Sequence, residues 1–231
     1  TNLTIIFCII YTYVYSMNSY TEENYLKALF ILSTESGETT VNALSKSLEI
    51  KMPTVNSMMK KLSEKGLVNY ESYKPVKLTE KGKKEAALII RKHRLTEMFL
   101  VEKMGFGWEQ VHDIAEQVEH IKSPAFFDKM DELLAYPKVD PHGSPIPDKH
   151  GKIVWKKYTP LCECIKGQAV VLAAVTHSSD DFLKFLNARG LHLGISLKIK
   201  SVEPFDGSMV VSYAKKTETL SLVVCEKLLV A

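Results

Sequence analysis

Apolar residues recur at helical spacing in three successive segments near the start of the chain, and two short β-like runs follow them. Thr40 and Pro53 stand where they favour a helix start, and Ser72–Pro75 form a turn between the two runs. In chain order the segments and runs are 21–32, 41–48, 53–65, 67–71 and 76–79. Helices joined by tight turns and followed by a hairpin are the plan of a winged helix-turn-helix.

Three more helical patterns follow, then a loop rich in proline and glycine, and then a β-rich tail. The helical patterns cover 81–103, 108–120 and 123–134, and the loop covers 140–147. In the tail we expect four strands and one short helix, at 169–175, 196–202, 209–213, 220–224 and, for the helix, 182–188. The pattern therefore predicts a mainly α chain with small β parts.

These elements divide the chain into five parts. We expect a winged-helix domain at 17–84, a helical domain at 85–140, a linker at 141–160 and a small barrel-like β domain at 161–231. Residues 1–16 carry an apolar run that is shorter than the ~20 residues a membrane span needs, and they lack the flanks of a secretory signal. We therefore expect a misassigned leader with the true start at Met17; a membrane anchor is the alternative.

Composition excludes several classes of protein. The chain has 231 residues, of which 45% are hydrophobic and 25% charged, and this excludes collagen-like, low-complexity and wholly disordered proteins. The four cysteines are too sparse for a secreted disulfide scaffold, which points to a reducing compartment, the cytoplasm, with no membrane partner. Cys162 and Cys164 are expected to be structural, and His142 and His150 to be solvated.

Charge supports DNA binding by the winged helix. The formal net charge of the whole chain is only +3, but residues 51–84 hold nine lysines and three glutamates. Lysines neutralise phosphates, short polar side chains reach base edges, and a proline can contact a thymine methyl. The candidate DNA-binding residues are Lys51, Pro53, Thr54, Asn56, Ser57, Lys60, Lys61 and Lys74. The alternative is a winged helix that serves only as a protein-interaction module.

The two middle helical patterns carry the types of side chain that bind transition metals. His93 and Glu97 are four positions apart and share a helix face. A second set falls within an arc of about 100° if its segment is helical, and consists of His112, Glu116, Glu119 and His120. A site of imidazoles and carboxylates without thiolates favours Mn²⁺ or Fe²⁺. The alternative is a solvated acidic face.

Several short motifs, in order and spacing, resemble the diphtheria-toxin-repressor and manganese-transport-regulator family of metal-dependent transcriptional repressors. The resemblance runs from about Tyr20 to the C-terminus. The motifs are Thr21-Glu-Glu-Asn-Tyr-Leu, Pro53-Thr-Val, Leu78-Thr-Glu-Lys-Gly, Arg91-Lys-His-Arg-Leu, Val111-His-Asp, Glu119-His120 and Gly143-Ser-Pro-Ile-Pro. The resemblance implies a winged helix, a helical dimerisation domain with the metal sites, and an SH3-like C-terminal β-barrel.

The resemblance also implies roles for individual residues. An ancillary metal site would comprise His93, Glu97 and His112. The primary regulatory site would comprise Glu116, Glu119 and His120, completed from the first helix at Asn24. The family commonly has methionine or aspartate at that last position, so either the Asn24 carbonyl or Glu23 is the expected ligand. Glutamate at position 116 resembles the manganese-responsive branch.

Three functions are consistent with these residues. The first is a homodimeric, metal-activated repressor of metal-uptake genes, which binds a palindromic double-stranded DNA operator and is not an enzyme. The second is a metal-dependent hydrolase with Glu97 or Glu119 as general base. The third is a structural metalloprotein whose ion only holds the fold. The sequence favours the first, because the metal-binding pattern adjoins a DNA-binding module and no nucleophile motif or Gly-rich phosphate loop accompanies it.

Overall fold

The computed structural model describes residues 18–231 apart from 35, 177 and 178, so the predicted leader lies outside the described residues. The chain forms two compact units. One holds the described residues up to Ile90 together with Asp148–Lys152, and the other holds Arg91–Pro147 and Ile153–Ala231. In the part of the chain that the structure describes, no helix has the length and apolar character that crossing a bilayer requires.

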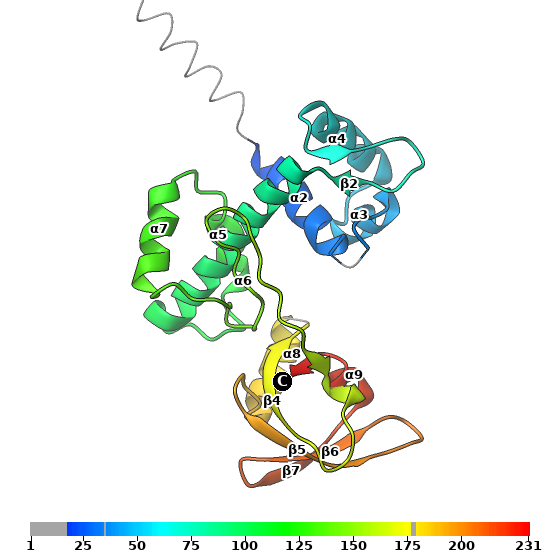
Figure 1. Cartoon of the computed structure of the whole chain (residues 1–231), viewed down its shortest axis with the longest axis vertical. Helices are drawn as coiled ribbons and strands as arrows, with labels where there is room; N and C mark the ends of the chain where they lie inside the picture. The colour runs from blue at the N-terminus through cyan, green and yellow to red at the C-terminus, as the bar shows by residue number, and fades with distance from the viewer. Residues whose placement is uncertain (1–17, 35, 177–178) are drawn as a thin grey trace, which may run out of the picture. The chain divides into compact units, whose positions relative to one another are not determined.

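The first unit contains the predicted winged helix (Figure 1). Its elements are α2 (Tyr20–Leu32), α3 (Val41–Ser47), α4 (Met52–Glu64), β1 (Val68–Asn69) and β2 (Lys77–Leu78). The strands pair antiparallel, as the hairpin prediction required. Apolar side chains from all three helices fill one core, among them Leu26, Leu44 and Met59, which are fully buried.

Local sequence explains how these helices begin. The Ser19 side chain accepts a hydrogen bond from the Glu22 backbone N–H, and the Glu22 carboxylate accepts one from the Ser19 N–H, which together form a capping box. Thr40 caps α3 through the Ala43 N–H, as predicted. Pro53 lies in the first turn of α4, where its missing N–H costs nothing.

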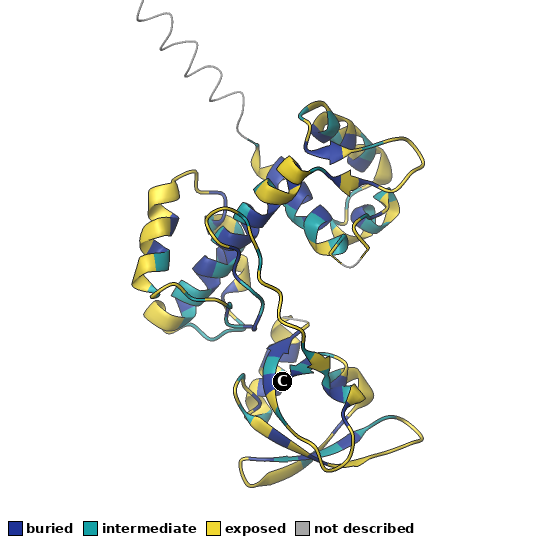
Figure 2. Ribbon diagram, in the orientation of Figure 1, coloured by how far each residue is buried: buried dark blue, intermediate teal, exposed yellow. Residues whose placement is uncertain are grey.

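The second unit begins inside α5 (Glu80–Met104) and continues with α6 (His112–Val118) and α7 (Pro124–Leu133). The prediction of one helix over 108–120 was wrong at its start, because Trp108–Val111 form turns and α6 begins only at His112. Glu119 is the C-cap of α6 and keeps helical dihedral angles, whereas His120 follows in a turn. Figure 2 shows the buried stripe along α5 and the exposed outer face of α7.

The C-terminal region forms the predicted SH3-like β domain, a six-stranded antiparallel sheet in the order β3-β8-β4-β5-β6-β7. The strands are β3 (Thr159–Pro160), β4 (Ala169–Val175), β5 (Ser196–Val202), β6 (Met209–Tyr213), β7 (Lys216–Leu220) and β8 (Leu228–Val230). The short helices are η1 (Leu161–Glu163), α8 (Asp180–Arg189) and α9 (Leu222–Cys225). Register shifts between β4 and β8 and between β5 and β6 bend the sheet.

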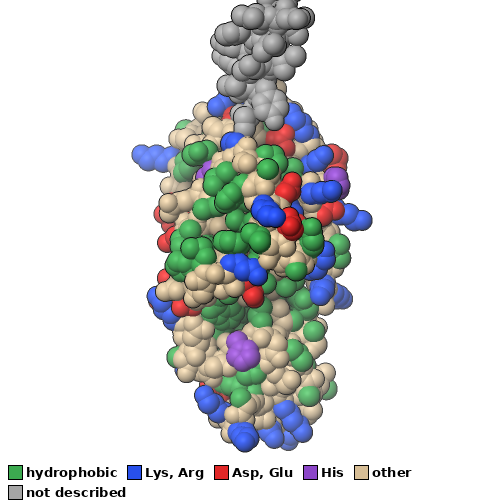
Figure 3. Space-filling model, turned by 90° about the vertical axis from the view of Figure 1, so that its left-hand side faces the viewer, with side chains coloured by type: hydrophobic (Ala, Val, Ile, Leu, Met, Phe, Trp, Pro, Cys, Tyr) green, Lys and Arg blue, Asp and Glu red, His purple; other side chains and the backbone are tan. Residues whose placement is uncertain are grey.

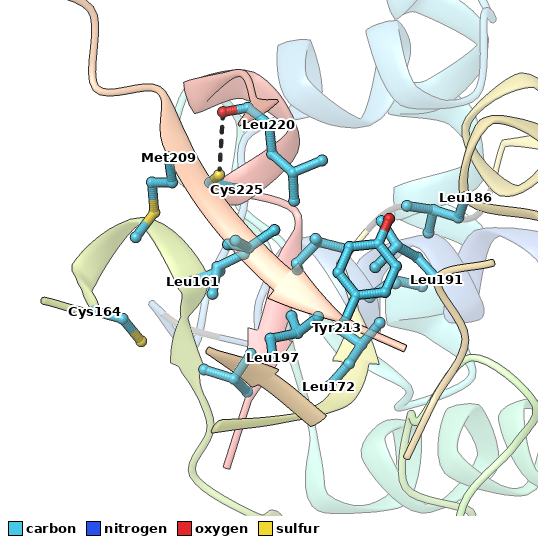
Figure 4. Packing of buried hydrophobic residues seen from close by; sticks show 14 of the residues in the cluster. Leu161, Cys164, Leu172, Leu186, Leu191, Leu197, Met209, Tyr213, Leu220 and Cys225 are labelled. Atoms are coloured by element: carbon cyan, nitrogen blue, oxygen red, sulfur yellow. Dashed lines mark hydrogen bonds between the residues drawn. The ribbon is translucent and has the colours of Figure 1, made fainter. Parts of the chain in front are cut away.

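The strand predicted at 220–224 was wrong, because Leu220 ends β7 and α9 follows it. The Cys225 thiol lies 3.8 Å from the Leu220 carbonyl oxygen, inside a core that includes Leu161, Leu172 and Tyr213 (Figure 4). Burial raises the pKa of the Cys225 thiol to about 12. All three cysteines among the described residues are free thiols. Cys164 and Cys225 are buried in this core and half-buried Cys162 packs against it, and the structural role of the Cys162–Cys164 pair stays a prediction.

Candidate metal centre and DNA-binding surface

Helix α5 presents His93 and Glu97 one turn apart, and both side chains are buried. The imidazole Nε2 of His93 lies 3.1 Å from a Glu97 carboxylate oxygen. Its Nδ1 lies 2.6 Å from a carboxylate oxygen of Glu119, at the end of α6. Both ring nitrogens of His93 therefore face carboxylates, although a neutral imidazole can donate only one hydrogen bond.

The remaining predicted ligands adjoin this pair. His112 lies 3.5 Å from Glu97 through Nδ1 and 3.6 Å from Glu116 through Nε2. His120 Nε2 lies 4.0 Å from a Glu119 oxygen. The structure thus brings five of the candidates into one cluster, namely His93, Glu97, His112, Glu116 and Glu119, and His120 adjoins Glu119 in the chain. Donor atoms of His93, His112 and Glu116 fall within 4.8 Å of one another.

A second group of donors was missed by the sequence analysis. Glu97, Asp140 and His142 also place one donor atom each within 4.8 Å of one another, and all three are buried. The expectation that His142 is solvated was wrong, because its side chain is only 6% exposed. The signal available in the sequence was the Asp140-Pro141-His142-Gly143 turn, which directly follows the acidic helices.

Backbone and side-chain contacts hold Asp140 in place. One carboxylate oxygen of Asp140 accepts hydrogen bonds from the backbone N–H groups of His142 (2.8 Å) and Ser144 (2.9 Å). The other lies 3.4 Å from Arg94 Nε. Burial and the neighbouring charge of Glu97 raise the pKa of Asp140, and Arg94 and His142 oppose this only partly.

Glu97 is the centre of the electrostatics. Burial alone raises its pKa, but the imidazoles of His112, His142 and His93 outweigh that effect and hold the pKa well below 4.5. The contact between Glu97 and His142 also acts on the imidazole. Burial lowers the pKa of the His142 imidazole, but the effect of the Glu97 carboxylate is larger and raises that pKa. Buried carboxylates that gather imidazoles in this way need a cation to balance them, either a proton or a metal ion.

The donor set fits a divalent transition metal. Carboxylate oxygens and imidazole nitrogens suit Mn²⁺ and Fe²⁺, and no thiol belongs to either donor group among the described residues. The first-helix candidates Glu23 and Asn24 lie in α2, in the other unit. The Asn24 side-chain oxygen is buried and has no hydrogen-bond partner among the described residues, as expected of an oxygen available to a ligand.

The predicted DNA-binding residues lie on α4, at its start and in the wing. Lys51, Pro53, Thr54, Ser57 and Lys60 are exposed. The other three candidates contact side chains of the protein itself. Asn56 accepts a hydrogen bond from the Tyr70 hydroxyl. Lys61 pairs with buried Glu22 at 3.2 Å, and Lys74 pairs with Glu71 at 2.8 Å.

Tyr73, which was not among the predicted DNA-binding residues, lies in the turn of the wing. Its side chain is fully exposed and its φ is +68°. The wing therefore presents an exposed aromatic ring beside the basic residues.

Family models match most of the chain. Residues 17–76 match the N-terminal DNA-binding domain of iron-dependent repressors, and residues 79–148 match their metal-binding and dimerisation domain. The chain belongs to the iron-dependent repressor family. Residues 159–231 of this family member match the FeoA domain.

Two curated relatives of this family member are a repressor and a transcriptional regulator. It is 35% identical over 128 residues to the iron-dependent repressor IdeR of Mycobacterium tuberculosis, which is 55% of each chain, so it spans about half the length of that relative. It is 32% identical over 118 residues to the transcriptional regulator MntR of Oceanobacillus iheyensis, which covers 51% of this chain and 80% of MntR.

Solved structures align over nearly the full length. A manganese-dependent transcriptional repressor in complex with manganese superposes with a TM-score of 0.82 at 28% identity, over 91% of this chain and 99% of the other. ScaR with bound Zn²⁺ superposes with a TM-score of 0.74 at 32% identity, over 91% and 98%.

Proposed function

We propose that this family member is a metal-activated, DNA-binding repressor of metal-uptake genes, with Mn²⁺ or Fe²⁺ as the activating ion. The observation that carries the proposal is the cluster of carboxylates and imidazoles, most of them buried, on α5, α6 and the 140–142 turn. The other unit of the chain is a winged helix with an exposed polar face. When bound, the ion would supply the positive charge that these carboxylates lack.

The family roles are carried over as part of this proposal. The ancillary site would comprise His93, Glu97 and His112, and Asp140 and His142 would join it because they share Glu97. The regulatory site would comprise Glu116, Glu119 and His120, completed from α2 by Asn24 or Glu23. The short contact between His93 and Glu119 supports mutual influence of the two sites.

We also infer a homodimer formed through the outer face of the helical domain. Large apolar side chains of the helical domain are 38% to 58% exposed, and they are Met104, Ile121, Phe126, Leu133 and Tyr136. Figure 3 shows hydrophobic side chains gathered on the side of the molecule that carries α7. Large exposed apolar side chains gathered on one side favour an interface, and a two-fold dimer matches a palindromic operator.

Each part of the chain would then have its own role. The domain at 17–84 would bind double-stranded DNA, the domain at 85–140 would bind metal and dimerise, the segment 141–160 would connect, and the domain at 161–231 would modulate the sensor. We place the regulator in the cytoplasm, where operator DNA is accessible, with no membrane partner and no enzymatic activity.

The test is operator binding at controlled free concentrations of Mn²⁺, Fe²⁺ and Zn²⁺, measured by fluorescence anisotropy. The operator is first selected from random duplexes in the presence of Mn²⁺. We expect binding at micromolar or lower free Mn²⁺ or Fe²⁺ and loss of binding after chelation. Metal-independent operator binding would favour the structural metalloprotein, and metal-dependent hydrolysis of ester or amide substrates would favour the hydrolase.

A further inference from the structure

The imidazole of His142 has its tautomer set by a backbone carbonyl. Its Nε2 lies 2.9 Å from the carbonyl oxygen of Trp108. A carbonyl oxygen only accepts, so Nε2 carries the hydrogen and donates it. In the neutral ring Nδ1 then holds the lone pair, and Nδ1 is the atom that lies 3.8 Å from a Glu97 oxygen. The nitrogen that can bind a cation therefore faces the donor group.

Trp108 is itself held by α8 of the β domain, within the same compact unit. Its indole N–H donates to the side-chain oxygen of Asn187 at 2.8 Å. The Asn187 amide nitrogen in turn donates to the Glu109 carboxylate at 3.0 Å. The indole can only donate and the carboxylate can only accept, so the two contacts fix the orientation of the Asn187 amide.

The ring and the backbone around His142 are packed as well. The Trp108 and His142 rings stack with centroids 5.9 Å apart and 18° between their planes. The His142 carbonyl accepts a hydrogen bond from the Val175 N–H at the end of β4 (3.0 Å). Gly143 has φ +88°, and a Cβ there would lie 2.4 Å from the Ala173 carbonyl oxygen, so the turn lies directly against β4.

We propose that Trp108 is a positioning residue for the metal site of Glu97, Asp140 and His142, and that Asn187 of α8 holds Trp108 in place for this role. This inference rests on the proposed function. Contacts that orient a metal-binding histidine preorganise the site, and their loss commonly lowers metal affinity 10- to 100-fold. The C-terminal domain thereby contributes to metal affinity through a hydrogen bond to Trp108.

The experiment uses the full chain and isothermal titration with Mn²⁺. Trp108→Phe removes the indole donor and keeps a ring and the backbone carbonyl, and Asn187→Ala removes its acceptor. We expect each variant to bind one Mn²⁺ about 10-fold more weakly than the wild type. Trp155→Phe is the matched control, because Trp155 is exposed outside this network, and its titration should equal the wild type. Circular dichroism melting verifies that the variants are folded.

A second readout separates positioning from general stability. At a pH high enough to keep the imidazoles neutral, nitrogen-15 spectra should show His142 as the Nε2–H tautomer in the metal-free wild type and a mixture of tautomers in Asn187→Ala. Wild-type Mn²⁺ affinity and an unchanged tautomer in both variants would overturn the inference. His142→Ala distinguishes the two levels of the argument: if it loses one Mn²⁺ while the Trp108 and Asn187 variants bind normally, only this inference fails. If His142→Ala loses no metal, the proposed metal site fails too.

Discussion

At the scale of single residues, Glu22 connects α2 to the DNA-binding helix. Its carboxylate is 1% exposed and pairs with Lys65 at 2.8 Å and Lys61 at 3.2 Å, both at the end of α4. Burial raises the Glu22 pKa, but hydrogen bonds from Lys65, the Ser19 backbone and Lys61 together lower it from 4.5 to about 2. Because the folded-state pKa lies below the ordinary value, the ionised carboxylate stabilises the fold above pH 4.5. That stabilisation is lost as the pH falls towards 2.

We therefore predict that Glu22→Gln lowers the free energy of unfolding by roughly 1–3 kcal/mol at pH 7, since partly exposed lysines screen the full effect. Urea unfolding at pH 7 and pH 3 measures this, and the difference from the wild type should shrink at pH 3. Glu71→Gln is the control, because its pair with Lys74 is exposed and contributes little. An equal loss at both pH values would show that the charge of Glu22 is not what stabilises this contact.

The sequence predicted the helical ligands better than the loop ligands. Positions four apart on one helix, such as His93 and Glu97, share a face by geometry alone. Asp140 and His142 reach Glu97 only because the 140–147 loop folds back onto α5, where Arg94 pairs with Asp140. Helical periodicity does not predict that a loop packs back onto a helix, and a loop rich in proline and glycine suggests solvent exposure instead.

At the scale of elements, α4 and the wing have different expected roles in DNA binding. Asn56 and Ser57 lie on α4 and can reach base edges, whereas Lys60 and Lys74 are exposed charges that contact phosphates. We predict that Ser57→Ala or Asn56→Ala lowers the ratio of operator to random-DNA affinity.

Lys60→Ala or Lys74→Ala should instead weaken both affinities alike and reduce the salt slope by about one. Salt titrations with both DNAs measure the two effects, with the exposed Lys129→Ala on α7 as a control. A changed sequence preference in Lys74→Ala with the salt slope intact would show that the wing reads bases and not phosphates.

The predicted ends of helices were correct where a capping residue or a first-turn proline marked them. Thr40 and Pro53 marked their helices correctly because caps and first-turn prolines are local signals. The run Leu220–Val224 was predicted as a strand, yet the chain turns at Ser221 and Leu222–Cys225 form a helical turn that buries Cys225 in the β-domain core. The burial of Cys225 in the core, and not the local strand propensity, determines the structure of this segment.

At the scale of the whole molecule, a palindromic operator needs two copies of the chain. Phe126 and Leu133 on α7 are about half exposed, and a buried charge at their interface would be costly. We predict that Phe126→Asp or Leu133→Asp gives a monomer by analytical ultracentrifugation and weakens operator binding at least 10-fold. Phe205→Asp, at an exposed apolar site in the β domain, should remain dimeric. A dimeric Phe126→Asp, Leu133→Asp double variant would place the interface elsewhere.

The central claim is that a divalent ion held by the α5–α6 cluster switches the chain to its DNA-binding state. An ion can do so only if it binds that state more tightly, so its ligands must come together there. The most direct measurement is operator affinity against free Mn²⁺ for the wild type and for His120→Ala, with His150→Ala as the exposed histidine control. We expect activation in the wild type and the control and none in His120→Ala. Identical activation curves for all three proteins would contradict the claim.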